Sequence, residues 1–457
     1  MAVVSGGGVH YYVRTKLSVH TFLAPAVNPA SAEQLDWHRI TRPGDTVVCS
    51  HMTAEPVALL RALAASGAHD GHFELFLGVP FSDAANGFTG ATILTTFGAM
   101  GSAGTLARSH ATRISVAAYS QCGDAFASGA SGADVVLVSL ARDARGGLCL
   151  GASHGYVIDA ARRARVVIAE INALAPAISG APWPDDIAIA ERIETSYPLA
   201  VAAEPRVSEV ERRIAGHVAA LVPDGACLQV GIGSLSSAVV EGLRDHRFLG
   251  VHSGMLTPAL HALVERGSAD NSRKAIDVGV SVTACVYGDV ALYAAANANP
   301  ALRLREPRYT HGRDVIARLD RFVALNSALE VDLLGQANAE IAIGRDGVAR
   351  LVGGVGGLND FVRGARAANG GRAIVALPSR QPARAGTPGP GAARIVARLS
   401  GPATVAAADA DVVVTEYGSA DLRHATLGER ARRLIAIAHP DDRDALAAAA
   451  ATLAIGA

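Results

Sequence analysis

The sequence is poor in charged, aromatic and cysteine residues, and each shortage excludes a class of protein. Only 18% of its 457 residues are charged, 5% are aromatic, and the formal net charge is −1. A chain without a basic excess is not expected to be a dedicated nucleic-acid binder. Because half of the residues are hydrophobic, the chain also has too much apolar surface to remain disordered.

Sequence signals for metals, disulfides and nucleotides are also missing. The five cysteines, which form no C-x-x-C pair, are Cys49, Cys122, Cys149, Cys227 and Cys285. Their odd number and wide spacing predict neither a disulfide framework nor a thiolate metal site. No histidines have H-x-x-x-H or H-E-x-x-H spacing, and no phosphate-binding G-x-x-x-x-G-K-[ST] motif is present. Gly231-Ile232-Gly233 lacks the third glycine of a dinucleotide-binding fingerprint, so we expect no metal and no permanently bound cofactor.

Nothing in the sequence predicts secretion or a membrane span. The first residues lack a basic region followed by an apolar run. The longest charge-free stretch lies between Asp83 and Arg108, but five glycines interrupt it. These glycines favour loops and buried elements over a membrane helix. We therefore expect a cytoplasmic protein.

Glycine, by contrast, is abundant, with 48 residues among many short runs of Val and Ala.

At roughly 150 residues per domain, the length predicts two or three domains. Two segments, Pro43–Leu60 and Pro223–Val240, match without a gap, and each is predicted as a turn, a strand, a loop and a helix. A second match pairs Ala133–Val138 with Ala410–Thr415. These repeats predict two tandem related α/β domains, each with a mostly parallel sheet covered by helices.

A proline-rich segment between Asn172 and Arg206 separates the two halves. Its prolines are Pro176, Pro182, Pro184, Pro198 and Pro205, a density typical of a crossing segment. Directly after it, Ser208 and Glu211 have the spacing of a capping box and predict a helix start. We therefore predict an N-terminal domain over residues 1–205 and a C-terminal domain over residues 206–457.

The C-terminal half is predicted to alternate strands and helices. Its strand-length apolar runs are Cys227–Val230, Phe248–Val251, Arg372–Leu377 and Val412–Thr415, and Thr426 and Glu429 repeat the capping-box spacing. In parallel sheets, ligands bind at loops that leave the carboxyl ends of strands. The loops that we expect to form the site are Gly231–Ser237, His252–Thr257 and Glu416–Asp421.

Three motifs of this half have residue types suited to chemistry. The glycine cluster Gly353–Phe361 allows close approach of the backbone to a ligand, or is simply a mobile turn. The segment Asn326–Gln336 places amides and carboxylates in an apolar stretch, where they are either functional or paired in a polar network. Glu416 follows a predicted strand, the place of a catalytic carboxylate or of a solvated surface residue.

Together these segments resemble the acetyl-CoA hydrolase/transferase family, the class I CoA-transferases that include 4-hydroxybutyrate and succinyl-CoA:acetate CoA-transferases. The matching stretches are, in order, Val230–Gly233, Leu249–Ser253, Leu325–Asp332, Gly356–Ala365, Val414–Gly418 and Ile437–Pro440. The resemblance covers the chain from about Ser208 to Arg443. In the first half it is confined mainly to Glu55–Leu60.

The resemblance implies transfer of CoA from an acyl-CoA to a free carboxylate through an enzyme glutamate, which becomes a glutamyl-CoA thioester. It implies that the Asn326 amide and the Gly357 N–H stabilise the oxyanion, with Glu416 near the reacting centre. Acyl-CoA and a carboxylate are then the substrates, and a homodimer or homotetramer is expected. The implied CoA-binding residues are Gly231, Ile232, Gly233, Ser234, Leu235, Ser236, Gly353 and Gly356, with Arg380 and Arg384 as partners for a CoA phosphate.

This chain departs from the family pattern at the nucleophile itself. The family glutamate lies between a His-Ser/Thr pair and Met, and here that position is Gly254, in His252-Ser253-Gly254-Met255. Glycine has no side chain with which to form the anhydride. Two smaller departures are Leu235-Ser236 in place of Ile-Pro, and Pro382 in place of a lysine.

We expect a CoA-transferase, because the implied oxyanion donors and Glu416 are present, with two alternatives left open. The transferase would act on a short-chain acyl-CoA, using another carboxylate such as Glu416 or a direct ternary mechanism. The first alternative is an acyl-CoA hydrolase, in which Glu416 or His252 activates a water. The second is a catalytically inactive acyl-CoA-binding protein. In each case we expect first-half residues around Met52–Glu55 and Phe88–Met100 to set the width of the acyl pocket.

Overall fold

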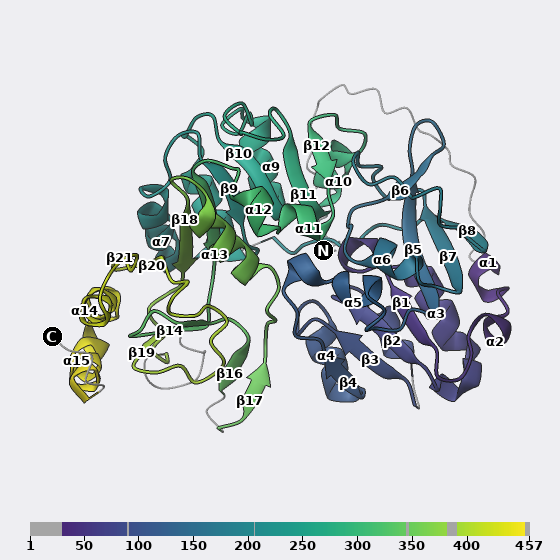
Figure 1. The fold of residues 1–457 in the computed structure, drawn as a ribbon, viewed down its shortest axis with the longest axis horizontal. Helices are drawn as coiled ribbons and strands as arrows, with labels where there is room; N and C mark the ends of the chain where they lie inside the picture. The colour runs from purple at the N-terminus through teal and green to yellow at the C-terminus, as the bar shows by residue number, and fades with distance from the viewer. Residues whose placement is uncertain (1–29, 89–90, 205, 344–346, 382–390, 453–457) are drawn as a thin grey trace, which may run out of the picture.

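The computed structural model describes residues 30–88, 91–204, 206–343, 347–381 and 391–452. Two α/β halves lie side by side, each built on one large sheet (Figure 1). Strand pairing in both sheets is mostly parallel, and helices cover them. The predicted fold class is confirmed. The boundary at residue 205 stays a prediction, although the two sheets lie on either side of it.

The sheet of the N-terminal half has the strand order β4-β3-β2-β1-β5-β7-β8, with β6 antiparallel to β5. Its strands are β1 (Thr46–Cys49), β2 (Glu74–Gly78), β3 (Ile93–Thr96), β4 (Thr112–Ile114), β5 (Val135–Arg142), β6 (Leu148–Leu150), β7 (Val166–Asn172) and β8 (Glu191–Thr195). Its α-helices are α1 (Ala30–Glu33), α2 (Trp37–Ile40), α3 (Val57–Ser66), α4 (Ala103–Ser109), α5 (Asp124–Ala127) and α6 (Val157–Ala161).

The sheet of the C-terminal half has the order β12-β11-β10-β9-β13-β18-β20-β21, in which β21 is antiparallel to β20. Its strands are β9 (Cys227–Val230), β10 (Gly250–Leu256), β11 (Ser281–Val286), β12 (Leu302–Leu304), β13 (Phe322–Asn326), β18 (Arg372–Ala376), β20 (Val412–Thr415) and β21 (Gly418–Asp421). Two small sheets contain β14 (Glu330–Asp332), β15 (Ala337–Asn338) and β19 (Ile395–Val396), and β16 (Ile341–Ile343) and β17 (Ala349–Leu351).

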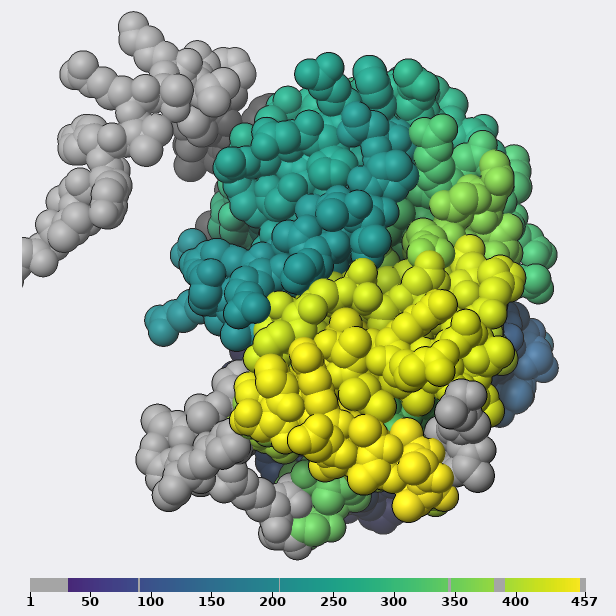
Figure 2. All heavy atoms as spheres, turned by 90° about the vertical axis from the view of Figure 1, so that its left-hand side faces the viewer, coloured from purple at the N-terminus to yellow at the C-terminus, as the bar shows by residue number. Residues whose placement is uncertain are grey.

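Helices of the C-terminal half cover this sheet and extend beyond it. They are α7 (Glu209–Ala219), α8 (Ser234–Gly242), α9 (Pro258–Glu265), α10 (Val290–Ala296), α11 (Pro307–Thr310), α12 (Arg313–Ile316), α13 (Leu358–Ala367), α14 (Leu427–Ile437) and α15 (Arg443–Thr452). The chain from β20 to α15 forms much of the outer side of this half, in yellow in Figure 2. Among the described residues, no helix is both long and apolar enough to cross a membrane.

The two large sheets repeat one topology. β1 and β9 hold the same place in their strand orders, as the match between Pro43–Leu60 and Pro223–Val240 predicts. The second predicted match is wrong, because β5 lies next to β1 whereas β20 lies two strands beyond the equivalent β13. Both strands are buried and rich in Val, and interior parallel strands share that composition wherever they lie in a sheet.

Local signals in the C-terminal half are largely confirmed. β9 and β20 have the predicted bounds, and complete capping boxes form at Ser208 and Thr426. The predicted loop His252–Thr257 is wrong, because β10 continues to Leu256. The predicted loop Glu416–Asp421 is mostly β21. In both cases pairing with a neighbouring strand overrides the polar sequence.

The carboxyl ends of the N-terminal strands face the C-terminal half. Backbone hydrogen bonds cross the interface from Ala99 N–H to Gly353 O (2.8 Å) and from Tyr119 N–H to Gly356 O (3.0 Å). Arg308 forms ion pairs with Asp124 and Asp159 of the other half. One hydrophobic cluster also contains residues of both halves, so the two halves share a packed core beside the predicted site.

Candidate functional site

Gly254 lies within β10 and is partly exposed, so the position of the missing nucleophile is accessible. β10 pairs with β9, and β9 pairs with β13. The adjacent Ser253 joins β10 to β9 through a hydrogen bond from its hydroxyl to Val230 O (3.3 Å). The structure therefore brings Gly254 beside the strands that lead to the Gly231 loop and to Asn326.

The imidazole of His311 occupies the space beside Gly254. A Cβ built on Gly254 would lie 2.7 Å from His311 Nε2, and one built on Gly357 would lie 2.4 Å from His311 Cδ2. Real Cβ atoms do not approach other atoms so closely, so a side chain at either position would displace the ring. His311 comes directly after α11 and is 4% exposed. No motif in the sequence marks this histidine.

Aromatic neighbours and a hydroxyl hold the His311 ring. Its centroid is 4.4 Å from that of Phe361 and 4.8 Å from that of Tyr119. Nδ1 lies 2.7 Å from Thr310 Oγ1. Burial, with a smaller effect of nearby His252, lowers the pKa of His311 to about 3, so the ring is neutral at physiological pH.

Asn326 is partly exposed at the end of β13 and is held by Gln229. The two amides form reciprocal hydrogen bonds, from Asn326 Nδ2 to Gln229 Oε1 (3.0 Å) and from Gln229 Nε2 to Asn326 Oδ1 (3.2 Å). One amide N–H of Asn326 is left for a ligand. The helix α13 that begins after Gly357 packs on β13, so the two predicted oxyanion donors come from adjacent elements.

The glycine loop before α13 has a structural role that the sequence did not reveal. A Cβ at Gly354 would lie 2.3 Å from Phe97 O, and a Cβ at Gly98 would lie 2.5 Å from Gly353 O. The absence of side chains therefore allows the backbones of the two halves to meet. These contacts, with the hydrogen bond from Tyr119 N–H to Gly356 O, fix Gly353 and Gly356 at the junction of the two halves, and their contact with CoA stays a prediction.

Glu416 is not brought to Gly254. Its carboxylate accepts hydrogen bonds from Ser379 N–H (2.8 Å) and Ser379 Oγ (2.7 Å), and the residue is buried. It follows β20, which is four strands from β10 in the sheet. At the usual spacing of neighbouring strands, that separation is about 19 Å. This geometry gives no support to Glu416 as a replacement nucleophile.

His252 is also kept away from solvent. The residue is fully buried, and its Nε2 donates to Thr310 O at 3.0 Å. Its Nδ1 is completely buried without a partner. Burial, and to a lesser extent Lys274, lower the pKa of His252 to about 3. Its observed contact anchors the Thr310–His311 segment.

The predicted loop Gly231–Ser237 is a loop only as far as Gly233, because α8 begins at Ser234. Ile232 is 55% exposed, and Gly233 adopts a left-handed φ of 109° just before the helix. Ser234 donates to Glu211, while Leu235 and Ser236 are buried. A Cβ at Gly231 would lie 3.5 Å from Asn326 Oδ1, so this loop borders the predicted oxyanion donor.

Of the two arginines predicted to bind a CoA phosphate, the structure describes only Arg380. Arg380 is engaged by two carboxylates, with Nη2 2.5 Å from Asp442 and Nη1 3.3 Å from Asp441. A phosphate would have to compete with these groups. Arg384 lies outside the described residues.

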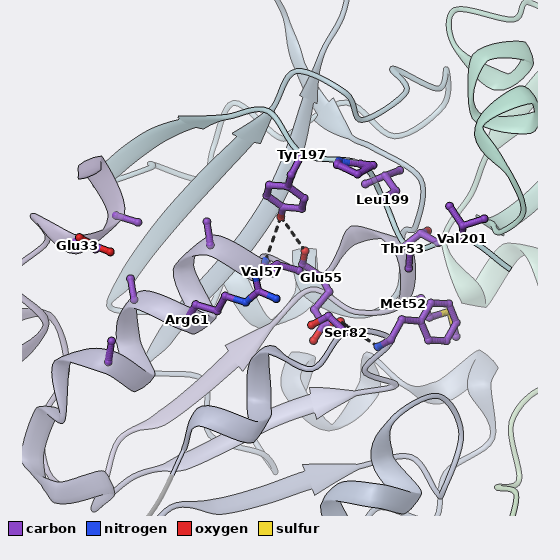
Figure 3. Close-up of a pocket in the computed structure, with 17 residues that line it drawn as sticks. Glu33, Met52, Thr53, Glu55, Val57, Arg61, Ser82, Tyr197, Leu199 and Val201 are labelled. Carbon is purple, nitrogen blue, oxygen red and sulfur yellow. Dashed lines mark hydrogen bonds between the residues drawn. The ribbon is translucent and has the colours of Figure 1, made fainter. Parts of the chain in front are cut away.

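A cavity of about 770 Å³ opens in the N-terminal half, lined by Met52, Thr53 and Glu55 (Figure 3). Its wall also includes Tyr197, whose hydroxyl lies 3.1 Å from Val57 N. The described part of Phe88–Met100 contributes no lining residue. The Met52 sulfur lies 4.0 Å from the hydroxyl of Tyr119, the residue that packs on His311. Neither Gly254 nor His311 lines the cavity itself.

Glu55 is the buried acid of this cavity. Its Oε2 accepts from Phe81 N–H (3.0 Å) and Ser82 N–H (2.7 Å), while its Oε1 is buried without a partner. Burial raises the pKa of Glu55 above its usual range. Most of the remaining lining is apolar, and Glu33 and Arg61 are its other charged residues.

The comparisons with known proteins agree with this geometry. Residues 288–450 match the model of the acetyl-CoA hydrolase/transferase C-terminal domain. The chain is 38% identical over 317 residues to the 4-hydroxybutyrate coenzyme A transferase of Clostridium kluyveri, covering 68% of this chain and 71% of that protein. The chain belongs to the acetyl-CoA hydrolase/transferase family. It is therefore an enzyme of a family whose substrates are CoA thioesters.

Solved structures extend the likeness to both halves of this family member. RipA from Yersinia pestis has a TM-score of 0.83 and 30% identity, over 94% of this chain and 97% of that chain. A 4-hydroxybutyrate CoA-transferase from Porphyromonas gingivalis has a TM-score of 0.76 and 32% identity, over 93% and 97%. The N-terminal half, where the sequence resemblance is confined mainly to Glu55–Leu60, therefore shares the family fold.

Proposed function

We propose that this protein is an acyl-CoA hydrolase that cleaves a short-chain acyl-CoA thioester with water, without forming an enzyme–CoA thioester. The observation that carries the proposal is Gly254, at the family's glutamate position, with His311 filling the adjacent space. Glu416 is fixed by Ser379 at a distance of four strands. Without a carboxylate at the carbonyl, the acceptor must be a free molecule, and water is always present.

The remaining site favours binding of an acyl-CoA. The Asn326 amide and the Gly357 N–H are placed on adjacent elements, where they can stabilise the charge that develops on the thioester oxygen. Residues Gly231–Gly233 and the first turn of α8, Ser234–Ser236, would line the path of CoA. The cavity beside Met52 would receive the acyl group or part of the pantetheine arm, since its walls are largely apolar.

The test is a thiol-release assay over acetyl-, propionyl-, butyryl- and 4-hydroxybutyryl-CoA, with and without acetate or succinate. Hydrolysis predicts stoichiometric free CoA without an acceptor, and no borohydride-sensitive enzyme thioester. Asn326→Ala should lower the rate about 10²- to 10³-fold, as the loss of an oxyanion donor does in other enzymes. Release that requires an added carboxylate, with CoA appearing on it, would contradict hydrolysis.

A CoA-transferase that uses a ternary complex is the second candidate. Its support is the 38% identity to a named CoA-transferase over two thirds of the chain. In that mechanism the acceptor carboxylate attacks the thioester itself, and the resulting anhydride is then attacked by CoA. Sequential rather than ping-pong kinetics would identify it. Tight acyl-CoA binding with neither activity would instead indicate a non-catalytic binding protein.

A further inference from the structure

The His311 ring is placed where a group acting on the thioester would lie. It is enclosed by two glycines, Gly254 on β10 and Gly357 at the start of α13. Both are partly exposed. The ring thus lies between the position of the missing nucleophile and one of the predicted oxyanion donors. Neither glycine could carry a side chain without moving the ring.

Hydrogen bonding leaves one ring nitrogen available. The Thr310 hydroxyl lies 3.3 Å from Glu306 O, to which it can donate, and 2.7 Å from His311 Nδ1. With the hydroxyl proton on the Glu306 side, Nδ1–H donates to Thr310 Oγ1, and Nε2 holds a free lone pair. Nε2 has no hydrogen-bond partner among the described residues.

Other histidines nearby do not offer this arrangement. His51 Nε2 lies 3.0 Å from the Tyr119 hydroxyl, and its Nδ1 is completely buried. His252 donates through Nε2 to Thr310 O, and its Nδ1 is completely buried too. Nε2 of His311 is not among the completely buried, unpartnered atoms of the described residues.

We propose that His311 Nε2 is the general base that activates the hydrolytic water, at the place where the family carries its glutamate. This inference rests on the proposed hydrolase function and names the residue that performs its proton transfer. Stacking on Tyr119 and Phe361 and the contact with Thr310 fix the ring plane, so the lone pair needs little reorganisation.

The proposed step balances without a further reactant. As the water oxygen bonds to the thioester carbon, one water proton moves to Nε2 and the carbonyl electron pair moves to oxygen. Re-formation of the carbonyl breaks the C–S bond, and the imidazolium returns its proton to the departing sulfur. The products are free CoA thiol and a carboxylic acid, which ionises in water. A neutral imidazole is required at the start, and burial favours it. The same burial disfavours the imidazolium, so the step requires the negative charge on the carbonyl oxygen to form together with it.

The substitution that isolates this role is His311→Asn. An Asn amide can keep the contact with Thr310 but places no basic nitrogen at Nε2. We expect kcat for thiol release to fall 10²- to 10⁴-fold, the usual contribution of a general base, with KM changed less than threefold. The matched control is His217→Asn on the exposed face of α7, which should retain wild-type kcat.

Rescue separates catalysis from a structural role. His311→Ala leaves space between two glycines. Added imidazole should raise the kcat of this variant at least tenfold, and the increase should depend on the concentration of neutral imidazole. Melting curves for both variants verify folding. Rates within threefold of wild type for His311→Asn and His311→Ala would overturn the assignment while leaving hydrolysis intact. A wild-type enzyme that releases no thiol from any acyl-CoA would overturn both proposals.

Discussion

Each half of the molecule packs a buried histidine against a glycine on the corresponding strand of its sheet. In the N-terminal half, a Cβ at Gly78 of β2 would lie 2.8 Å from His51 Nδ1. In the C-terminal half, a Cβ at Gly254 of β10 would lie 2.7 Å from His311 Nε2. β2 and β10 hold the same place in the two strand orders. Burial lowers the pKa of both histidines to about 3.

The two histidines differ in what their nitrogens can do. His51 is closed into the N-terminal core by Tyr119, Tyr156 and Gly155. His311 uses Nδ1 for Thr310 and keeps Nε2 free, beside two partly exposed glycines. Burial and a lowered pKa therefore do not by themselves make a histidine catalytic. What distinguishes a candidate base is an unsatisfied nitrogen that faces an accessible space.

The sharpest test of this comparison makes one substitution in both places. His311→Asn should lose 10² to 10⁴ of kcat with little change in stability. His51→Asn should keep kcat within about threefold but lower the free energy of unfolding by about 1–3 kcal/mol, because the Tyr119 hydroxyl loses its partner. Thiol release and urea denaturation measure the two effects. Equal losses of kcat in both variants would remove the distinction.

Returning a carboxylate to position 254 tests whether His311 occupies the space that the family glutamate would fill. Gly254→Glu alone should be destabilised by about 1–3 kcal/mol from overpacking against His311, and should form no enzyme–CoA thioester. The double variant Gly254→Glu with His311→Ala has space for the new side chain. It should form a borohydride-sensitive thioester and gain CoA transfer to acetate. If Gly254→Glu alone formed the enzyme–CoA thioester at wild-type stability, His311 would not occupy the space of the family glutamate.

Methyl additions compare the two glycines directly. Gly254→Ala should cost about 1–3 kcal/mol of stability through contact with the ring. Gly78→Ala should cost about 1 kcal/mol more, because Gly78 has a left-handed φ of 64° and its Cβ would lie 2.5 Å from the Tyr156 hydroxyl. Only Gly254→Ala should lower kcat. A larger loss of stability in Gly254→Ala than in Gly78→Ala, measured from denaturation curves, would contradict this expectation.

The smallest expected effect is the response of activity to pH. Because the pKa of His311 is about 3, its base form is already complete above pH 5. The described titratable groups with a contact or electrostatic effect on the ring are His252 on β10 and Tyr119. The kcat/KM of folded enzyme should therefore change less than twofold between pH 5 and 8. An acid limb near 6.5 would indicate an exposed histidine instead.

Stability should respond to pH where activity does not. Buried histidines with a lowered folded pKa stabilise the protein fully above their unfolded pKa of about 6.5 and lose that contribution as pH falls. Each of His51, His252 and His311 contributes a slope of up to about 1.4 kcal/mol per pH unit. Urea midpoints between pH 5 and 8 measure this decline, and a shallower slope in His51→Asn would confirm its origin.

Much of the fold was predictable because its signals are local. The capping boxes at Ser208 and Thr426, and the apolar runs of β9 and β20, depend on neighbouring residues and appear where the sequence predicts them. β10 was predicted to end too early, at Val251, whereas it continues to Leu256. Its polar side chains are compatible with an interior strand only because Thr310 and Val230 accept their hydrogen bonds.

The site was predictable only in part, for a similar reason. Resemblance identified Gly254 as an empty nucleophile position, but no sequence pattern connects it with His311. A closely packed interior requires some group to fill the space that a lost side chain leaves. That requirement predicts that a filler exists, and only the structure identifies it. The role of the glycine loop, which is to let the backbones of the two halves meet, likewise becomes visible only in the structure, where Phe97 lies beside it.

The most direct measurement is the intact mass of the wild-type enzyme during turnover of acetyl-CoA, with free thiol recorded in the same mixture. We expect thiol to accumulate over many turnovers while the protein mass stays unchanged. A protein species heavier by one CoA, mapped to Glu416 or to any other carboxylate, would contradict the account, because a covalent route would then operate without a side chain at position 254.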